Sequence, residues 1–326
     1  MLVSVLMSVY NSEEYLADAI DSILNQTHSD FEFIIVDDGS KDNSLSIIEK
    51  YASEDFRIKL IKNSFNKGLA HSLNSGILFA SGTYIARQDA DDVSALNRLE
   101  LQMNYALSHP EVDIIGSNCF IIDIASETVY EDKVYSNSFN FFKKLLNKQA
   151  IFPHGSAFFK KSKIIEYGMY DIRFYYVQDG ELWLRAISAK ANIYVMDESL
   201  YHYRITPDLN LKRQPAKKMF NRVLQMLYLE KSGFNLVDEE LVEIKKFLLE
   251  SPKRTKLDYM PDYWKSLANS TYLNKSPWQK SFKYISKAIK ENNSLLKYPQ
   301  YFFLILLYFV PIDCVKFLHE RFVNKS

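Results

Sequence analysis

The chain carries Tyr84-Ile-Ala-Arg-Gln-Asp-Ala-Asp-Asp92, which joins an apolar strand pattern to a run of carboxylates. A second stretch, Phe33-Ile-Ile-Val-Asp-Asp-Gly-Ser40, has the same arrangement, and a third acidic site follows at Gln178-Asp179. Open α/β sheets build their ligand crevice at the carboxyl ends of strands. Carboxylates placed there can hold a metal ion and a phosphorylated ligand. Either strand-end motif alone is also compatible with an acidic turn that caps a helix, but together they predict an enzyme.

The first part of the chain alternates strand and helix patterns, which predicts a parallel, doubly wound sheet. The continuous apolar run at 3–9 is typical of a strand covered on both faces. Asn11 is expected to cap the first helix, with Glu14 completing a capping box. Further strands are expected at 31–36, 58–61 and 83–87, and helices at about 41–52 and 69–80.

Beyond this region the pattern becomes mixed. Helices are expected at 96–107, 139–148 and 179–189, and strands at 114–122, 156–159 and 193–196. After residue 211 the apolar residues recur at helical spacing. The sequence therefore predicts an α/β part followed by a helical C-terminal region.

The composition is that of an ordered globular protein, with 326 residues, 47% hydrophobic and 25% charged. The formal net charge is zero, but residues 271–326 contain nine basic and three acidic residues, a net charge of +6. The first 270 residues therefore carry −6, which favours cations near the acidic motifs. Cys119 and Cys314 lie far apart, so a reduced, intracellular setting is expected rather than a disulfide framework.

The tail contains an uninterrupted apolar run from Tyr301 to Val310, about half of the ~20 residues that a spanning helix requires. Lysines flank it, so it is expected either to pack as a buried helix or to lie in a membrane interface.

The apolar residues 1–9 lack a basic region and a cleavage site, which favours a buried strand over a targeting segment. A cytoplasmic protein is expected, with peripheral contact to the inner face of the plasma membrane as an alternative.

Several motifs together resemble the family 2 glycosyltransferases. The resemblance covers about residues 1–205 in the family's order and spacing. Besides the motifs above, it rests on Val3-Ser-Val-Leu-Met-Ser-Val-Tyr-Asn11, Ile23-Leu-Asn-Gln-Thr27, Asn66-Lys67-Gly68, Gln178-Asp-Gly-Glu-Leu-Trp-Leu-Arg185 and Tyr203-Arg204.

This resemblance implies a GT-A fold, a Rossmann-like mixed sheet flanked by helices, with a C-terminal helical extension. It implies a catalytic domain at 1–210, divided into a nucleotide-sugar half (1–95) and an acceptor half (96–210), followed by a helical region at 211–326. The implied reaction transfers a hexose from a nucleotide-diphosphate donor to a hydroxyl of a glycan or lipid-linked acceptor, with inversion. Bacterial surface polysaccharide assembly is the implied pathway, and nucleic acid is not an expected partner.

Site residues follow from the same resemblance, position by position. Asp179 would be the general base and Asp91 the ligand of Mn2+ or Mg2+. The donor would be bound by Val9, Tyr10, Asn11, Asp38, Arg87 and Asp89, with a structural salt bridge as the alternative for Arg87. His154 and Gln178 would lie on the acceptor side. These residue types suit the chemistry, because a leaving diphosphate needs a cation and an attacking hydroxyl needs one base.

Three positions depart from the family's pattern. Ser8 replaces a proline, which should alter only the stiffness of the loop. Gln178 replaces the first acid of a Glu-Asp pair and removes a negative charge beside the expected base. Thr206 stands where many members carry a histidine near the metal, so His202 or Asp208 would have to supply any third protein ligand.

Two alternatives remain open. Gln178 and Thr206 leave room for a catalytically silent nucleotide-sugar-binding protein. A sugar-phosphate nucleotidyltransferase is less compatible, because that class has a glycine-rich basic loop where this chain has Tyr10-Asn11-Ser12-Glu13. An NAD-dependent enzyme is disfavoured, since the first strand is not followed by Gly-x-Gly-x-x-Gly.

Overall fold

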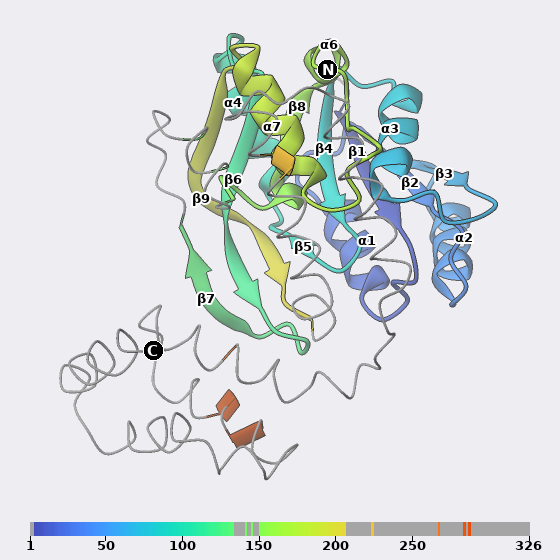
Figure 1. Cartoon of the computed structure of the whole chain (residues 1–326). Helices are drawn as coiled ribbons and strands as arrows, with labels where there is room; N and C mark the ends of the chain where they lie inside the picture. Colours follow the sequence, from blue (N-terminus) through green and yellow to red (C-terminus); the bar gives the residue numbers. More distant parts are fainter. Residues whose placement is uncertain are drawn as a thin grey trace, which may run out of the picture. The chain divides into compact units, whose positions relative to one another are not determined.

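A computed structural model describes residues 3–133, 141, 145, 150–206, 223, 224, 267, 283, 284, 286 and 287. Contacts divide the chain into two compact units. The larger unit contains Met1–Ile121, Glu131–Arg204 and Arg213–Ser251, and the smaller contains Ile122–Tyr130, Ile205–Lys212 and Pro252–Ser326. Figure 1 shows the described helices and strands coloured along the chain, and most of them belong to the larger unit.

The N-terminal half contains four parallel strands: β1 (Val3–Val9), β2 (Phe31–Asp37), β3 (Ile58–Lys62) and β4 (Tyr84–Asp89). They lie in the order β3-β2-β1-β4. The register pairs Val9 with Asp37 and Ser8 with Asp89. Parallel pairing thus brings both acidic motifs to the same edge of the sheet, on either side of the residues that end β1.

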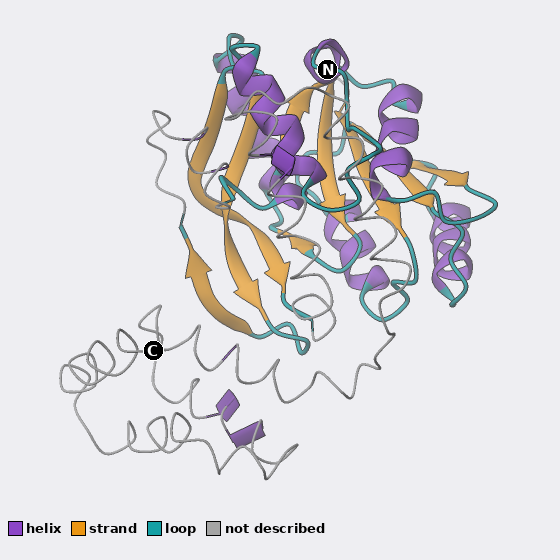
Figure 2. Ribbon diagram, viewed as in Figure 1, coloured by secondary structure: helices purple, strands orange, loops and turns teal. Residues whose placement is uncertain are grey.

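The second half adds antiparallel strands to the same sheet (Figure 2). β8 (Phe158–Lys160) pairs antiparallel with both β4 and β6 (Ile114–Ile122). Within the described residues the sheet has nine strands in the order β3-β2-β1-β4-β8-β6-β9-β5, and β7 pairs with β6. The remaining strands are β5 (Val93–Ser94), β7 (Thr128–Asp132) and β9 (Ile193–Arg204).

Helices pack on both faces of this mixed sheet. α1 (Leu16–Leu24), α2 (Ser44–Glu54) and α3 (Leu69–Phe79) connect the parallel strands, and α4 (Arg98–Ser108) follows β5. α6 (Lys161–Glu166) and α7 (Gln178–Ser188) lie between β8 and β9, and the 3-10 turn η2 (His154–Ser156) precedes β8.

Neighbouring side chains of β1 enter two separate cores. Leu6 packs in one cluster with residues of α3 and α7, whereas Val5 and Met7 pack in another with residues of α1 and α4. Successive side chains of a strand point to opposite faces. A strand covered on both faces therefore needs apolar residues throughout, which accounts for the run at 3–9.

The expected strands at 3–9 and 114–122 are confirmed at the expected bounds. The cap predicted for α1 is wrong: α1 begins at Leu16, and the Asn11 side chain bonds to the loop after β2 instead. The helix expected from residue 96 begins at Arg98 and is preceded by the short strand β5. The sequence patterns also missed β7 and α6.

Several expectations lie wholly or mostly outside the described residues. These are the helix at 139–148, the helical region after 211, Asp208 and the apolar run from Tyr301 to Val310. Within 139–148, the described residues Phe141 and Leu145 are helical and buried. In the part of the chain that the structure describes, no helix is long and apolar enough to span a bilayer.

Candidate active site

The Asp38 carboxylate organises the first wall of the site. Its side chain is buried, and its backbone N–H donates to the Val9 carbonyl over 2.8 Å. Oδ1 accepts hydrogen bonds from Asn63 Nδ2 (2.8 Å) and from the Lys67 N–H (3.0 Å), and Oδ2 accepts one from the Gly68 N–H (2.9 Å). Asp38 therefore fixes the turn that leads into α3.

The loop after β1 is joined to the loop after β2. Asn11 adopts a left-handed conformation with φ of 50°, its N–H donates to Ser40 Oγ (3.1 Å), and its Oδ1 accepts from the Lys41 N–H (2.7 Å). Tyr10, one residue earlier, is 45% exposed. The expected nucleotide loop is thus held by its asparagine while its tyrosine remains accessible.

Arg87 and Asp89 form an ion pair at the end of β4. Arg87 Nη2 lies 2.6 Å from Asp89 Oδ1, and the Asp89 N–H donates to the Tyr201 hydroxyl over 3.1 Å. The Arg87 side chain is almost fully buried, whereas a quarter of the Asp89 side chain is exposed. Within this pair the carboxylate is the group that a ligand can reach.

Arg204 of β9 donates hydrogen bonds to the next two acidic residues, Asp91 and Asp92. Its N–H donates to Asp92 Oδ1 (2.6 Å) and its Nε to the Asp91 carbonyl (2.7 Å). Its guanidinium lies over the Tyr15 ring, 4.3 Å from the ring centroid. Burial raises the pKa of Asp92, and the charges of Asp91 and Asp89 raise it further.

Three arginines within the described residues are fully buried in this region: Arg87, Arg98 and Arg204. Arg98 donates to the Arg87 carbonyl (2.8 Å), to Gln88 Oε1 (3.2 Å) and to Ser94 Oγ (2.9 Å). Burial lowers the pKa of Arg98 to about 10, which still leaves it charged at neutral pH. Fixed positive charges therefore surround residues 89–92, which are called the acidic loop from here on.

A divalent cation fits this loop on chemical grounds. Among the described residues, no three histidine, cysteine or acidic side chains are grouped so that they could hold a metal ion by themselves. Mg2+ is usually bound through one or two carboxylates together with substrate phosphates. Asp91 and Asp89 supply that number of carboxylates, and a quarter of the Asp89 side chain is exposed.

The residues expected on the acceptor side lie on α7 and η2. α7 begins at Gln178, directly after Val177, whose φ of 54° is rare for a β-branched residue. This turn puts Asp179 in the first turn of the helix, where the helix dipole favours a carboxylate. Gln178 is buried beside it.

His154 lies near both parts of the site. Its Nε2 is 2.7 Å from the Tyr170 hydroxyl. Burial lowers the pKa of His154 to about 4, the charge of Arg87 lowers it too, and the charges of Asp179 and Asp89 oppose this shift. The imidazole is therefore neutral at pH 7. The His154 ring also meets that of Trp183 in α7 edge-on, with centroids 6.3 Å apart, and a β-carbon on the adjacent Gly155 would lie 2.8 Å from Asp89 Oδ2. The η2 turn therefore contacts both α7 and the end of β4.

His202 was expected as a possible third metal ligand, because Thr206 stands where many members of the family have a histidine. In the structure His202 lies within the sheet. It pairs with Val93 across β9 and β5, and its ring lies 5.4 Å from that of Phe120. Burial lowers its pKa. The structure does not group His202 with two further potential ligands among the residues it describes, and Asp208 lies outside them.

Four residues of the site were not singled out from the sequence for these roles: Tyr170, Tyr201, Arg98 and Gly155. Tyr201 contacts Asp89 from 112 residues away, and no local pattern predicts this contact. Gly155 leaves room for the Tyr201 hydroxyl, and no local pattern predicts that contact either.

The sequence matches Glycosyl transferase family 2 over residues 4–168. The chain belongs to this family. An uncharacterized glycosyltransferase of Methanocaldococcus jannaschii is 37% identical over 223 residues, which are 68% of this chain and 77% of that protein. The O-antigen biosynthesis glycosyltransferase WbnJ of Escherichia coli is 34% identical over 63% of this chain and 80% of its own length.

Solved structures of glycosyltransferases share the fold of this one. The mannosyltransferase PcManGT from Pyrobaculum calidifontis, solved with GDP-Man and Mn2+, matches 98% of this chain and 87% of its own with a TM-score of 0.53 and 16% identity. At that identity the likeness concerns the fold alone. It confirms the expected GT-A fold for this glycosyltransferase.

Proposed function

We propose that this glycosyltransferase moves a hexose from a nucleotide-diphosphate donor to an acceptor hydroxyl with inversion at the anomeric carbon. The observation that carries the proposal is that η2 contacts elements from both halves of the fold: a β-carbon on Gly155 would lie 2.8 Å from Asp89 Oδ2, and the His154 ring lies 6.3 Å, centroid to centroid, from that of Trp183 in α7, the helix that carries Asp179. A donor held along the ends of β1, β2 and β4 would then present its sugar toward α7. The acceptor hydroxyl would approach from the same side.

Asp38 is proposed to bind the donor base. A carboxylate offers about four lone-pair positions, and protein donors fill three of them. The remaining position suits an N–H of a nucleobase. Tyr10 and the backbone of Val9 and Asn11 would line the same pocket. Arg87 would act through Asp89, because its guanidinium is buried and paired with that carboxylate.

Asp91, with Asp89, is proposed to hold Mn2+ or Mg2+ together with the diphosphate. Such a cation, when bound, neutralises the charge that develops on the leaving diphosphate. Arg204 keeps the backbone of this loop in place through the Asp91 carbonyl and the Asp92 carboxylate. The position of Asp91 therefore depends on β9 as well as on β4.

Asp179 is proposed to accept the proton of the attacking hydroxyl. Its place in the first turn of α7 leaves the side chain partly accessible. Inversion needs one base, so the uncharged Gln178 beside it does not argue against the reaction. His154, neutral at pH 7, would orient the acceptor or the sugar by a hydrogen bond.

Surface polysaccharide assembly is the proposed pathway, with a glycan or lipid-linked acceptor. The supporting observation is the similarity to WbnJ, a protein of O-antigen biosynthesis. The net charge of +6 over residues 271–326 would favour contact with an anionic membrane surface, where a lipid-linked acceptor is found.

The test is a thermal-shift screen of UDP- and GDP-sugars with and without Mn2+, followed by transfer assays with the stabilising donors. A donor at a hundred times its Kd should stabilise the fold by about 2.7 kcal/mol. Stabilisation without any transfer or slow donor hydrolysis would favour the catalytically silent alternative. If no nucleotide sugar raises the Tm, the proposed donor class is wrong.

A further inference from the structure

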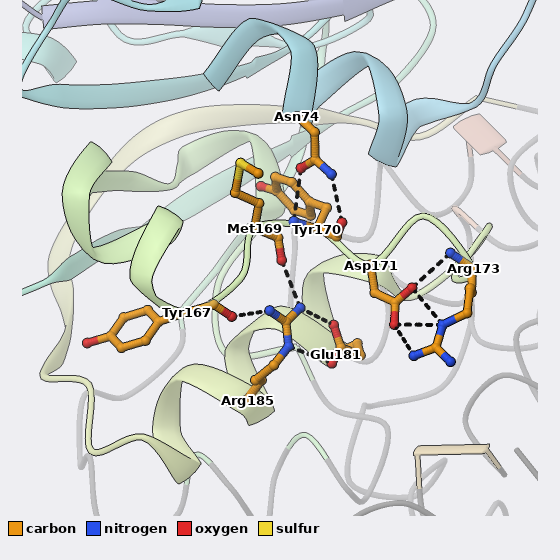
Figure 3. Close-up of polar contacts among 8 residues, drawn as sticks. All are labelled: Asn74, Tyr167, Met169, Tyr170, Asp171, Arg173, Glu181 and Arg185. Atoms are coloured by element: carbon orange, nitrogen blue, oxygen red, sulfur yellow. Dashed lines mark hydrogen bonds and ion pairs between the residues drawn. The ribbon is translucent and has the colours of Figure 1, made fainter. Parts of the chain in front are cut away.

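The segment around Tyr170 is clamped to the helix that begins at the donor loop. The Tyr170 N–H donates to Asn74 Oδ1 over 3.0 Å, and Asn74 Nδ2 donates to the Tyr170 carbonyl over 2.8 Å (Figure 3). Asn74 thus satisfies both backbone groups of Tyr170. It lies on α3, whose preceding turn is fixed by Asp38.

The other side of the segment is held by α7. Arg185 donates to the Met169 carbonyl over 2.8 Å and also to the Tyr167 carbonyl (Figure 3). The same guanidinium pairs with the buried Glu181, with Nε 2.9 Å from Oε1 and Nη2 2.5 Å from Oε2. Tyr170 therefore sits between the donor-side helix and the helix that carries Asp179.

The Tyr170 side chain is directed to the site. Its hydroxyl lies 2.7 Å from His154 Nε2, and its ring meets the imidazole edge-on, with centroids 5.5 Å apart. Only 2% of Tyr170 is exposed, so water cannot readily replace this hydrogen bond. Burial raises the pKa of Tyr170; the charge of Arg87 opposes this shift, while the charges of Asp179 and Asp89 add to it, so the hydroxyl keeps its proton.

We propose that Tyr170 is a positioning residue that holds the His154 imidazole in one orientation and one neutral tautomer, and that Asn74 sets the place of Tyr170 relative to the donor loop. A neutral imidazole has one donor and one acceptor nitrogen, and a hydrogen bond at one nitrogen decides what the other can offer. A tyrosine hydroxyl can donate or accept, and we assign it the donor role here: the Tyr170 O–H donates to Nε2, so the proton of the imidazole lies on Nδ1. The inference rests on the proposed function, because the ligand of Nδ1 would be the sugar or the acceptor.

The first measurement reads the tautomer directly, without any substrate. The side-chain nitrogen shifts of His154 are recorded at pH 7.5 in nitrogen-15 histidine-labelled protein and assigned with His154→Gln. We expect widely separated Nδ1 and Nε2 shifts in the wild type and averaged shifts in Tyr170→Phe. Unchanged His154 shifts in Tyr170→Phe would overturn the proposal.

The matched control is Tyr167→Phe. It removes another buried hydroxyl from the same segment, one that bonds Asp113 Oδ2 over 3.0 Å. This variant should lose stability comparable to that lost by Tyr170→Phe while leaving the His154 shifts as they are in the wild type. Averaged His154 shifts in both variants would mean general loosening and would also overturn the proposal.

The second measurement concerns turnover. Tyr170→Phe should lower kcat roughly tenfold, as expected when one positioned hydrogen bond is lost, and leave the KM for the donor unchanged. Asn74→Ala should lower kcat in the same way, because it frees the Tyr170 backbone. Wild-type kcat in both variants would refute the positioning role of Tyr170 and Asn74. A wild-type protein that transfers no sugar overturns the proposed function alone, since the nitrogen shifts test the tautomer independently.

Discussion

Gly155 approaches Tyr201 so closely that a β-carbon on it would lie 1.9 Å from the tyrosine hydroxyl oxygen. The same β-carbon would lie 2.8 Å from Asp89 Oδ2. The Tyr201 hydroxyl accepts a hydrogen bond from the Asp89 N–H. The glycine therefore lets η2 pack against the acidic loop right beside this hydrogen bond. A side chain at 155 must therefore displace either Tyr201 or Asp89.

Gly155→Ala should lower the free energy of unfolding by about 1–3 kcal/mol, the usual cost of overpacking a tight site. It should also weaken metal-dependent nucleotide binding, because the displaced groups include Asp89. Urea unfolding and nucleotide titration with Mn2+ measure the two effects.

Gly180→Ala is the matched control for stability. A β-carbon there would meet Leu224 Cδ1 at 4.0 Å, an ordinary contact. Gly180 lies within α7, where alanine is favoured over glycine by roughly 0.5–1 kcal/mol. We therefore expect opposite signs for the two glycine substitutions, and equal destabilisation would contradict this account of Gly155.

Asp91→Asn should abolish the Mn2+ dependence of UDP or GDP binding while the protein stays folded. The expected loss of metal-dependent affinity is roughly 10–100-fold or more, the range seen even for groups that only support a ligand. Asp197→Asn, at an exposed position of β9, serves as the control. If Asp91→Asn binds nucleotide as the wild type does with and without Mn2+, the assignment of the metal ligand is wrong.

Asp179→Asn should keep donor affinity and lower turnover by roughly 10²–10⁴-fold, the usual contribution of a general base. The amide has nearly the same shape as the carboxylate but cannot accept the proton. Glu166→Gln removes an exposed carboxylate at the end of α6 and should leave turnover unchanged. Turnover of the wild-type order in Asp179→Asn would refute the role of this residue.

The stability of the parallel half should depend on pH through Asp55. The hydrogen bonds from Arg57 lower the pKa of Asp55, and Arg57 also donates to the Leu24 carbonyl over 3.0 Å. A carboxyl group whose pKa is lower in the folded protein stabilises the fold at pH values above its pKa in the unfolded chain, about 3.9. This stabilisation is lost as the pH falls to the pKa that the group has in the folded protein.

Asp55→Asn should therefore cost about 1 kcal/mol at pH 7, and the difference from the wild type should shrink as the pH approaches 3. Urea unfolding across this range measures it. Glu49→Gln breaks the pair with Lys62, in which both side chains are about half exposed, and should change stability by less than about 0.5 kcal/mol. A pH-independent difference for Asp55→Asn would argue against the ion pair as its source.

The sequence predicted elements well where burial alone decides them. The strands at 3–9 and 114–122 are apolar because both faces are covered, so local composition reveals them. Helix starts were less predictable. Asn11 is a residue type that often caps helices, but its side chain accepts a hydrogen bond from Lys41, 30 residues away. A local sequence pattern cannot show that this distant contact replaces the cap. The two-residue strand β5 exists through its pairing with β9, which is equally non-local.

The site shows the same division between local and distant contacts. Carboxylates that follow parallel strands of one sheet lie at the same end of that sheet, so the placing of the first two acidic motifs on either side of the end of β1 followed from the sequence. The placing of Tyr170 by Asn74 joins residues 96 positions apart. The burial of Arg87 likewise depends on packing by the second half of the fold, and its ion pair with Asp89 agrees with the salt bridge that was the alternative expectation for this residue.

The bond between Arg204 and Asp92 spans 112 residues of the chain, which bears on how the protein is made. During synthesis β1 to β4 leave the ribosome long before Arg204 does, and long-range contacts of this kind form late. The nascent chain therefore carries the acidic loop without its backbone partner. Donor binding should be acquired only when β9 docks, so an incomplete chain would hold the signature motifs and still not retain the nucleotide sugar.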